Sequence, residues 1–264
     1  MDLSRASSCT YPVREQSVAE ALQIMAEAGV HKADLWGSPP QFSLISTQVG
    51  LDTILQAASD TGVAIANLGS YPGRAFISPN PAVREAELSA LKATLYAAKA
   101  LGARSIRVLP GNGDDPAQID LIAPYFAAGA QLAEELGVSM GMENHGGSLA
   151  GSPHDVKRLC ETVGSDYFGV LYEPANLTHG GVDYKAAFDI FSEHIVHIHL
   201  KDGTGFGPTF QRTHLGEGEI DYPWVIAAME SMGYVGDYAL EYEICDIEPI
   251  ASGLPKWVSY FASL

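Results

Sequence analysis

Two hydrophobic patterns alternate along this chain. Stretches with apolar residues at helical spacing begin at capping residues and end at a glycine, and a short apolar run follows each glycine. The predicted helix starts are Ser17 with Glu20 as a capping box, Asn80-Pro81, Asp115-Pro116, Ser152-Pro153 and Asp221. The predicted helix ends are Gly29, Gly62, Gly102, Gly137, Gly164 and Gly233.

The short apolar runs predict eight β-strands. They span residues 3–11, 30–36, 63–69, 103–110, 138–145, 166–174, 194–202 and 234–243. Strands that alternate with helices at about 30 residues per unit are typical of parallel βαβ units. Eight such units in 264 residues predict an α/β chain folded as a (β/α)8 TIM barrel. We expect one domain over residues 1–264, because no linker or low-complexity tract divides the sequence.

Polar residues recur at every second position of the run 194–202. Side chains alternate between the two faces of a strand, so His197, His199 and Lys201 share one face. The other face is expected to hold Val196, Ile198 and Leu200. In a barrel, the large apolar side chains pack on the helices and the other face points inward. The polar residues late in these strands should therefore meet at the C-terminal mouth, where enzymes of this fold have their active sites.

Four residues with metal-binding side chains close the last four predicted strands, all with inward parity. They are Glu143, Glu173, His199 and Glu241. Three carboxylates and an imidazole would repel one another in a water-poor site, and a divalent cation would remove that cost. Oxygen-rich ligation without thiolates suits Mn²⁺, Mg²⁺ or Co²⁺, and Zn²⁺ is also compatible. The sequence therefore predicts one divalent metal ion at the mouth.

Several neighbours of this cluster are candidate substrate contacts. His145 and Arg107 point inward at strand ends, although Arg107 fits a structural ion pair equally well. Lys201 is expected to pair with a carboxylate at the mouth, and His197 to be a hydrogen-bonded group one layer deeper. The glycine-rich segment 202–221 has the length of a mobile lid, with a solvated surface loop as the alternative. The remaining candidates include Arg212 and His214, as contacts to substrate hydroxyls or a phosphate. The aromatic residues near the mouth fit either stacking on a sugar ring or packing in the core or lid; they are Tyr71, Trp36 and Tyr11. Asp202 fits a loop or cap residue and a functional residue equally well, and Glu243 fits a solvated inward carboxylate.

The charge balance narrows the class of partner. With 15 basic and 32 acidic residues, the net charge of −17 argues against nucleic acid, which is bound through clustered Lys and Arg. Three widely spaced cysteines, Cys9, Cys160 and Cys245, indicate neither a disulfide framework nor a cysteine zinc site and favour a reducing cytoplasm. No apolar run is long enough to span a membrane. We expect a small-molecule sugar or polyol as the partner and leave a homo-oligomer open.

Longer motifs carry a resemblance to a known family. The segments "LGVSMGMENHGG", "EPAN", "HIHLKD", "HLGEGEIDYPWVIAAMESMGY" and "ALEYE" occur in an order and spacing similar to those of the xylose isomerase-like TIM barrels. This resemblance implies that Glu143, His199 and Glu241 are metal ligands, and that Glu143 and Glu241 are the carboxylates that move protons. Glu173 departs from the pattern, because the family usually has Asp at this position.

The resemblance implies a metal-dependent isomerase or epimerase of a sugar or a sugar-like hydroxy ketone. Such an enzyme abstracts a proton next to a carbonyl and passes through an enediolate. A dehydratase of a keto-inositol or dehydroshikimate type is the main alternative, and a non-catalytic sugar-binding barrel is a second one. A nuclease of the endonuclease IV type would need a basic mouth and more inward histidines, which this acidic chain does not offer.

Overall fold

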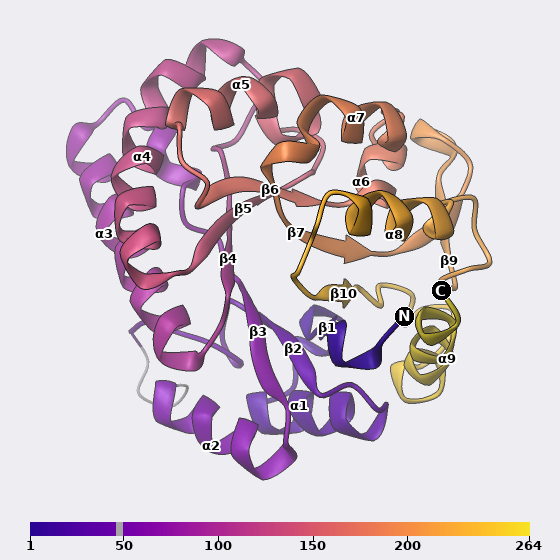
Figure 1. Ribbon diagram of the computed structural model, residues 1–264. Coiled ribbons are helices and arrows are strands. Elements are labelled where there is room, and N and C mark those ends of the chain that lie inside the picture. Colours follow the sequence, from indigo (N-terminus) through magenta and orange to yellow (C-terminus); the bar gives the residue numbers. More distant parts are fainter. Residues whose placement is uncertain (46–49) are drawn as a thin grey trace.

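The computed structural model describes residues 1–45 and 50–264, and eight parallel strands form a closed barrel at its centre (Figure 1). The order around the barrel is β1-β10-β7-β6-β5-β4-β3-β2. The barrel strands are β1 (Ala6–Cys9), β2 (Lys32–Trp36), β3 (Ala64–Gly69), β4 (Ser105–Val108), β5 (Ser139–Glu143), β6 (Phe168–Tyr172), β7 (Ile195–Leu200) and β10 (Tyr238–Leu240). The predicted (β/α)8 TIM barrel is thereby confirmed.

Helices surround the barrel on its outer side (Figure 1). They are α1 (Val18–Glu27), α2 (Leu51–Thr61), α3 (Pro81–Leu101), α4 (Ile119–Leu136), α5 (Pro153–Val163), α6 (Pro174–His179), α7 (Tyr184–Phe191), α8 (Tyr222–Ser231) and α9 (Ile250–Ser263). In the described parts of the chain, none of them combines the length and the apolar character needed to cross a membrane.

The predicted capping residues begin and end these helices. Ser17 and Glu20 form the expected reciprocal capping box at α1. Asn80, Ser152 and Asp221 accept backbone N–H groups at the first turns of α3, α5 and α8, and Asp115 caps a 3₁₀ turn just before α4. The glycines that end α2, α3, α4 and α5 adopt the left-handed conformation, which a residue without a Cβ reaches at little cost.

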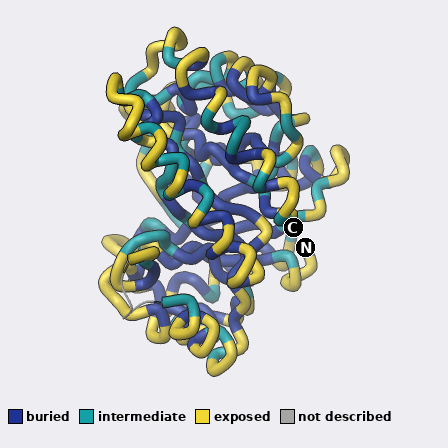
Figure 2. Tube along the Cα trace, turned by 90° about the vertical axis from the view of Figure 1, so that its left-hand side faces the viewer, coloured by how far each residue is buried: buried dark blue, intermediate teal, exposed yellow. Residues whose placement is uncertain are grey.

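The main hydrophobic core lies between the strands and the helices. In Figure 2 the buried parts of the trace run along the strands, and exposed parts follow the outer faces of the helices. Met140, Val170 and Leu200 are among the fully buried strand residues of this layer. The inside of the barrel is instead polar, with buried Ser7, Asp34, Asn67, Ser105 and His197. Buried polar groups need partners, so this interior favours hydrogen-bonded networks over apolar packing.

The predicted alternation fails at the start of β7. The register between β6 and β7 shifts after Val170, because one extra residue of β7 is inserted there. A Cβ added to Gly141 or Gly169 would lie 3.2 Å and 2.9 Å from Val196 side-chain atoms, so Val196 lies against these two glycines. The expectation that Val196 shares a face with Ile198 and Leu200 was wrong, since a bulge changes the parity of the residues before it.

The segment after β7 is more ordered in secondary structure than a plain glycine-rich loop. It forms an antiparallel hairpin of β8 (Asp202–Thr204) and β9 (Gln211–Thr213) next to the mouth. Asp202 organises this segment, because its carboxylate accepts the backbone N–H groups of Gly203, Gly216, Gly218 and Ile220 at 2.8–3.2 Å. These bonds agree with the expected loop role of Asp202, and a closing motion of the segment stays a prediction.

Candidate active site

Four side chains from adjacent strand ends converge at the C-terminal mouth of the barrel. Glu143, Glu173, His199 and Glu241 each offer one ligand atom, and these four atoms lie within 4.8 Å of one another. The Nδ1 atom of His199 is 3.6 Å from Glu173 Oε2, 3.6 Å from Glu241 Oε1 and 4.0 Å from Glu143 Oε1. All four residues are buried. The predicted grouping of these residues is therefore present; we call them the carboxylate cluster.

The backbone explains this convergence. Glu143 is the last residue of β5, and Glu173 follows β6 directly as the N-cap residue of α6. Glu241 follows β10, and its N–H donates to the carbonyl of Leu200 at 3.0 Å. His199 is paired with Ala239 of β10 in the sheet, and it directly precedes Leu200, which accepts this bond. Because parallel strands end at the same rim, residues far apart in the sequence meet around one point.

Several polar atoms of the carboxylate cluster have no hydrogen-bond partner in the described part of the chain. Among the described residues, both carboxylate oxygens of Glu173 and the Nδ1 atom of His199 are buried without a hydrogen-bond partner. Buried polar atoms without partners are costly, and two of these three, Glu173 Oε2 and His199 Nδ1, lie 3.6 Å apart in the cluster. Burial raises the pKa of Glu173 well above its usual value, and the nearby Glu241 adds to this rise. A divalent cation would offset each of these costs, so the donor set fits a metal ion.

Position 173 holds Glu where the family usually has Asp, and the Glu173 carboxylate still reaches the other ligand atoms of the cluster. Glu173 is fully buried, and its Oε2 atom lies as close to His199 Nδ1 as the Glu241 carboxylate does. The backbone N–H of Glu173 donates to Asn144 Oδ1 at 3.3 Å, which holds the turn into α6. The longer side chain is therefore accommodated inside the cluster.

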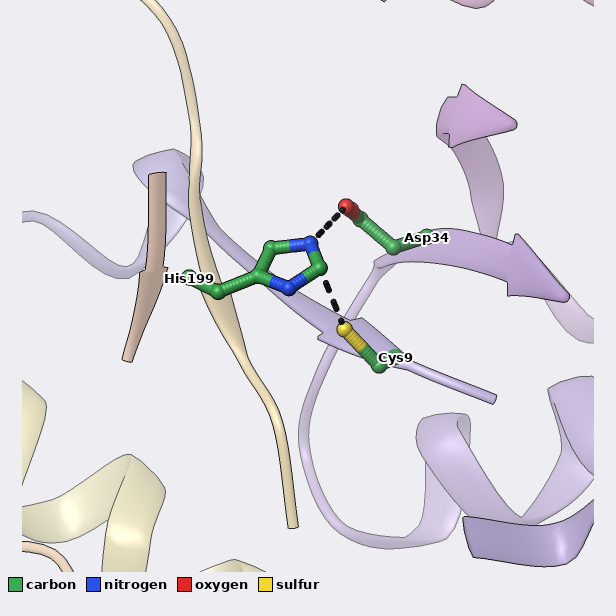
Figure 3. A group of neighbouring side chains, drawn as sticks. All are labelled: Cys9, Asp34 and His199. Atoms are coloured by element: carbon green, nitrogen blue, oxygen red, sulfur yellow. Dashed lines mark hydrogen bonds and ion pairs between the residues drawn. The ribbon is translucent and has the colours of Figure 1, made fainter. Parts of the chain in front are cut away.

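The opposite edge of the His199 ring faces a buried carboxylate. His199 Nε2 lies 3.3 Å from Asp34 Oδ2 and 3.7 Å from Cys9 Sγ, and Figure 3 shows both side chains beside the imidazole. Asp34 also accepts a bond from Ser7 Oγ at 2.7 Å and lies 2.6 Å from His197 Nε2. With Nε2–H donating to Asp34, Nδ1 is the ring nitrogen that faces the three glutamates, and its lone pair is available to a cation once Nδ1 is deprotonated.

Burial and charge set the protonation of this pair. Burial alone would raise the pKa of Asp34, but His197 and His199 hold it far below its usual value. Burial opposes charge on His199 as well, yet the acidic groups around it, Glu241 and Asp34 among them, raise its pKa well above the usual value. His197 contacts Asp34 and not the glutamates, in agreement with the expected deeper hydrogen-bonded role.

Each of the two glutamates expected to move protons has a cationic neighbour. Arg107 Nη1 donates to Glu143 Oε2 at 2.6 Å, and Asn176 Nδ2 donates to Glu143 Oε1 at 3.3 Å. Lys201 Nζ donates to Glu241 Oε2 at 2.8 Å. Burial alone would raise the pKa of Glu241, but the charges of Lys201 and His199 hold it well below its usual value. Glu241 is therefore a carboxylate at neutral pH.

Comparison with known proteins identifies the family of this chain. A family model described as "Xylose isomerase-like TIM barrel" matches residues 22–258, which is most of the chain. The chain belongs to this family.

The individual proteins that this chain is similar to are distant in sequence. Inosose dehydratase of Geobacillus thermodenitrificans is 26% identical over 139 residues, 47% of this chain and 47% of that protein. The chain matches less than half the length of the curated relatives, 39–47%. The structure of 3-keto-D-glucoside 4-epimerase from E. coli superposes with a TM-score of 0.78 at 13% identity, over 98% of this chain and 99% of that one. The structure of IOLI protein with a zinc atom gives a TM-score of 0.77 at 14% identity, over 98% and 96%.

A cavity of about 250 Å³ adjoins the carboxylate cluster, as expected for an active site of this fold. Its walls include Glu143 and Glu241 and three of the four predicted substrate contacts, His145, Arg107 and Lys201. The fourth, Arg212, lines a second cavity of about 530 Å³, which also touches His145 and Lys201. The two cavities therefore meet at the mouth.

Some of the other residues predicted from the sequence line the cavity, and others lie outside it. Tyr11 and Tyr71 line the cavity, whereas Trp36 donates its Nε1–H to the Tyr71 hydroxyl at 2.8 Å and supports that wall. The expectation for His214 was wrong, because its ring accepts a bond from Trp257 Nε1 at 3.2 Å and faces Glu248 at 3.1 Å, outside both cavities. Neighbouring residues of the hairpin segment thus point to different sides, which its sequence alone does not reveal.

Sequence reasoning missed three residues of this site. Asp34, Asn176 and Arg74 contact the cluster or line the cavity. Asp34 stands between the apolar residues Ala33 and Leu35 of β2, a position where a buried acid needs a partner, and this signal could have found it. Asn176 lies within the "EPAN" segment, whose turn into α6 carries it over the cluster. Arg74 has no comparable signal, since it lies in a loop whose direction depends on tertiary contacts.

Proposed function

We propose that this protein is a divalent-metal-dependent isomerase or epimerase of a sugar or sugar-like hydroxy ketone. The observation that carries the proposal is the carboxylate cluster itself. Four buried side chains aim their ligand atoms at one point, and three of the polar atoms there have no hydrogen-bond partner in the described structure. Epimerase and dehydratase relatives in the same family support the reaction class.

The residues that would hold the ion are Glu143, Glu173, His199 and Glu241. Three carboxylates and one imidazole suit Mn²⁺, Mg²⁺ or Co²⁺, and the zinc in the related IOLI structure makes Zn²⁺ a fourth candidate. When bound, the ion supplies Lewis acidity toward a substrate carbonyl. The Asp34 carboxylate contributes by keeping the His199 proton on Nε2.

In this proposal Glu143 and Glu241 move a proton across a substrate. Their strand ends are separated by β6 and β7 in the barrel order, so the two carboxylates approach the cavity from different sides. In the proposed reaction Glu241, ionised beside Lys201, takes the proton from the carbon next to the carbonyl. If Glu143 starts protonated and gives its proton to the opposite face, the result is epimerisation; Glu241 then holds the abstracted proton, and exchange with solvent restores both groups. If one carboxylate serves both carbons, the result is aldose–ketose isomerisation.

The cations beside these glutamates stabilise charge that develops on the substrate. Lys201 Nζ lies between Glu241 and Glu243, at 2.8 Å and 2.9 Å, and faces the cavity. Burial opposes its charge, but Glu241, Glu173 and Glu243 raise the pKa of Lys201 well above its usual value, so the ammonium persists at neutral pH. In this proposal Lys201 and Arg107 donate hydrogen bonds to substrate oxygens. Both side chains are already held by glutamates, so they need not move during the reaction.

Dehydration is the second candidate, favoured by the likeness to inosose dehydratase. It would begin with the same proton abstraction by Glu241. The C–O bond of a β-hydroxyl would then break, and the departing oxygen would take a proton from the Lys201 ammonium to leave as water. The two candidates thus share the base and differ in whether Lys201 acts as an acid.

A solvent-exchange assay tests the proposal. Metal-loaded protein is incubated in D₂O with free ketoses, keto-inositols, hydroxypyruvate and 3-dehydroshikimate, and deuterium at the carbon next to the carbonyl is measured by NMR. We expect exchange with wild type and its loss in Glu241→Gln. Glu248→Gln is the matched control, because Glu248 is also a paired glutamate, 2.7 Å from Lys256, but lies outside the cluster and both cavities. A protein that binds no divalent cation, or whose exchange survives Glu241→Gln, is not this enzyme, and a non-catalytic sugar-binding barrel would then be favoured.

A further inference from the structure

We propose that the cavity beside the carboxylate cluster binds a substrate with a negatively charged group, a carboxylate or a phosphate, and that Arg74 binds this group. The inference deepens the proposed function and rests on it in one respect only, that a substrate occupies this cavity. It concerns the part of the substrate away from the reacting carbon.

The cations around the two cavities differ in their partners. Arg107 is paired with Glu143 at 2.6 Å, Lys201 with Glu241 at 2.8 Å, and Arg212 with Glu243 at 3.8 Å. Arg74 lines the cavity but has no carboxylate within 4.0 Å among residues 1–45 and 50–264. Its guanidinium instead lies near the ring of Tyr71, 5.8 Å from the guanidinium carbon to the ring centroid. In a chain with 32 acidic and 15 basic residues, a cavity cation without an acidic partner is an exception.

The backbone that carries Arg74 is held in place. Arg74 begins a 3₁₀ turn, η4 (Arg74–Ile77), and the preceding Gly73 has φ +107°. A Cβ on Gly73 would lie 2.3 Å from the carbonyl oxygen of Leu109, so only glycine allows this close approach. The carboxylate of Glu87 accepts the N–H groups of Gly73 and Ala75 at 2.6 Å and 3.4 Å. The position of the arginine is therefore fixed although its side chain is exposed.

Tyr71 guides the guanidinium toward the cavity. Its hydroxyl accepts the Nε1–H of Trp36 at 2.8 Å, and the Arg107 guanidinium carbon lies 4.4 Å from its ring centroid. Arginine is attracted to aromatic faces, so the ring favours a conformation of Arg74 beside the cavity wall. A ligand reaching this wall would meet planar N–H donors, which match the oxygens of a carboxylate or phosphate.

The charged side chains that line the cavity also favour a negatively charged ligand. The charged residues that line the cavity are Arg74, Arg107, Lys201, Glu143, Glu241 and Glu243, and Arg107 and Lys201 each donate to one of these glutamates. Arg74 is then the remaining cation of the cavity. A cation without an acidic partner in the cavity wall favours an anion over a neutral sugar of the same size.

The test compares three probes of similar shape on metal-loaded protein by calorimetric titration. They are sorbitol, gluconate and sorbitol 6-phosphate, which carry no charge, a carboxylate and a phosphate. We expect at least one anion to bind about ten-fold more tightly than sorbitol, as one charge-assisted contact allows. This advantage should be lost in Arg74→Gln and largely kept in Arg74→Lys. The stronger of the two anions identifies which charged group the site prefers.

Arg14→Gln is the matched control, because Arg14 is also exposed near the mouth, 4.8 Å from the Tyr11 ring, but does not line the cavity. It should keep the advantage of the anion. Equal binding of all three probes, survival of the advantage in Arg74→Gln, or its loss in Arg14→Gln would overturn the inference. A wild type that binds no metal would contradict the proposed function, whereas an anion advantage that depends on Arg74 would still support this site.

Discussion

The two nitrogen atoms of His199 face two different acidic environments. Nε2 lies 3.3 Å from Asp34 Oδ2 inside the barrel, and Nδ1 lies 3.6 Å from both Glu173 and Glu241 at the mouth. One imidazole therefore connects the polar interior of the barrel to the carboxylate cluster. This arrangement makes the orientation of His199 depend on a residue 165 positions earlier in the chain.

Asp34→Asn should weaken metal binding about 10- to 100-fold, which is the range for loss of a carboxylate that orients a histidine ligand. The amide is neutral, so it no longer favours Nε2–H over Nδ1–H. Affinity is measured by competition with a chromogenic chelator. Ser7→Ala removes one bond to Asp34 Oδ1 and leaves the His199 contact, so its effect should be smaller. Equal affinity of Asp34→Asn and wild type would show that Asp34 does not orient the histidine.

Metal binding should release protons and weaken as the pH falls. Burial raises the pKa of Glu173, and the acidic surroundings outweigh burial to raise the pKa of His199, so in the metal-free protein both groups keep their protons to a higher pH than usual. A cation binds only their deprotonated forms. Calorimetry in two buffers with different ionisation enthalpies should therefore give different heats. Identical heats in the two buffers would mean that neither group loses a proton on binding.

Glu173→Gln should remove the stabilisation by added metal without lowering the stability of the metal-free protein. The neutral amide replaces a buried carboxyl whose charge is costly, so the metal-free variant should be at least as stable as metal-free wild type. The stabilisation of wild type by added metal, seen as a rise in Tm, should largely disappear. Glu243→Gln is the control and should keep the rise, since Glu243 is outside the cluster. A full metal-induced rise in Glu173→Gln would remove Glu173 from the ligand set.

Phe126→Ala should destabilise the fold by about 3–5 kcal/mol, the usual cost of a cavity left by a buried phenylalanine. The Phe126 ring is fully buried on α4 and contacts Phe76 and Phe168, with ring centroids 5.1 Å and 4.8 Å apart. Tyr96→Ala on the exposed side of α3 is the control and should change the free energy of unfolding by about 0.5 kcal/mol or less. Both values come from denaturant unfolding. A small effect at Phe126 would mean that the helix layer repacks around the gap.

Much of the fold could be predicted because its signals are local. Helix caps such as Ser17 and end glycines such as Gly137 act within one turn, and the structure has them at the expected positions. The bulge in β7 could not be predicted, since it depends on how Val196 fits against two glycines of neighbouring strands. The direction of His214 could not be predicted either, because its partners Trp257 and Glu248 belong to distant parts of the chain.

The sequence by itself determined the barrel, the rim at which the strands end, and the four residues that meet there. It could do so because hydrophobic periodicity and capping are properties of neighbouring residues, and strand parity then assigns each side chain a face. Only the tertiary structure decided that Asp34 faces His199, that Lys201 sits between two glutamates, and that Arg74 has the Tyr71 ring beside it and no acidic partner within the described residues. These relationships depend on distances between separate strands and loops, which closing of the barrel fixes and the order of residues does not.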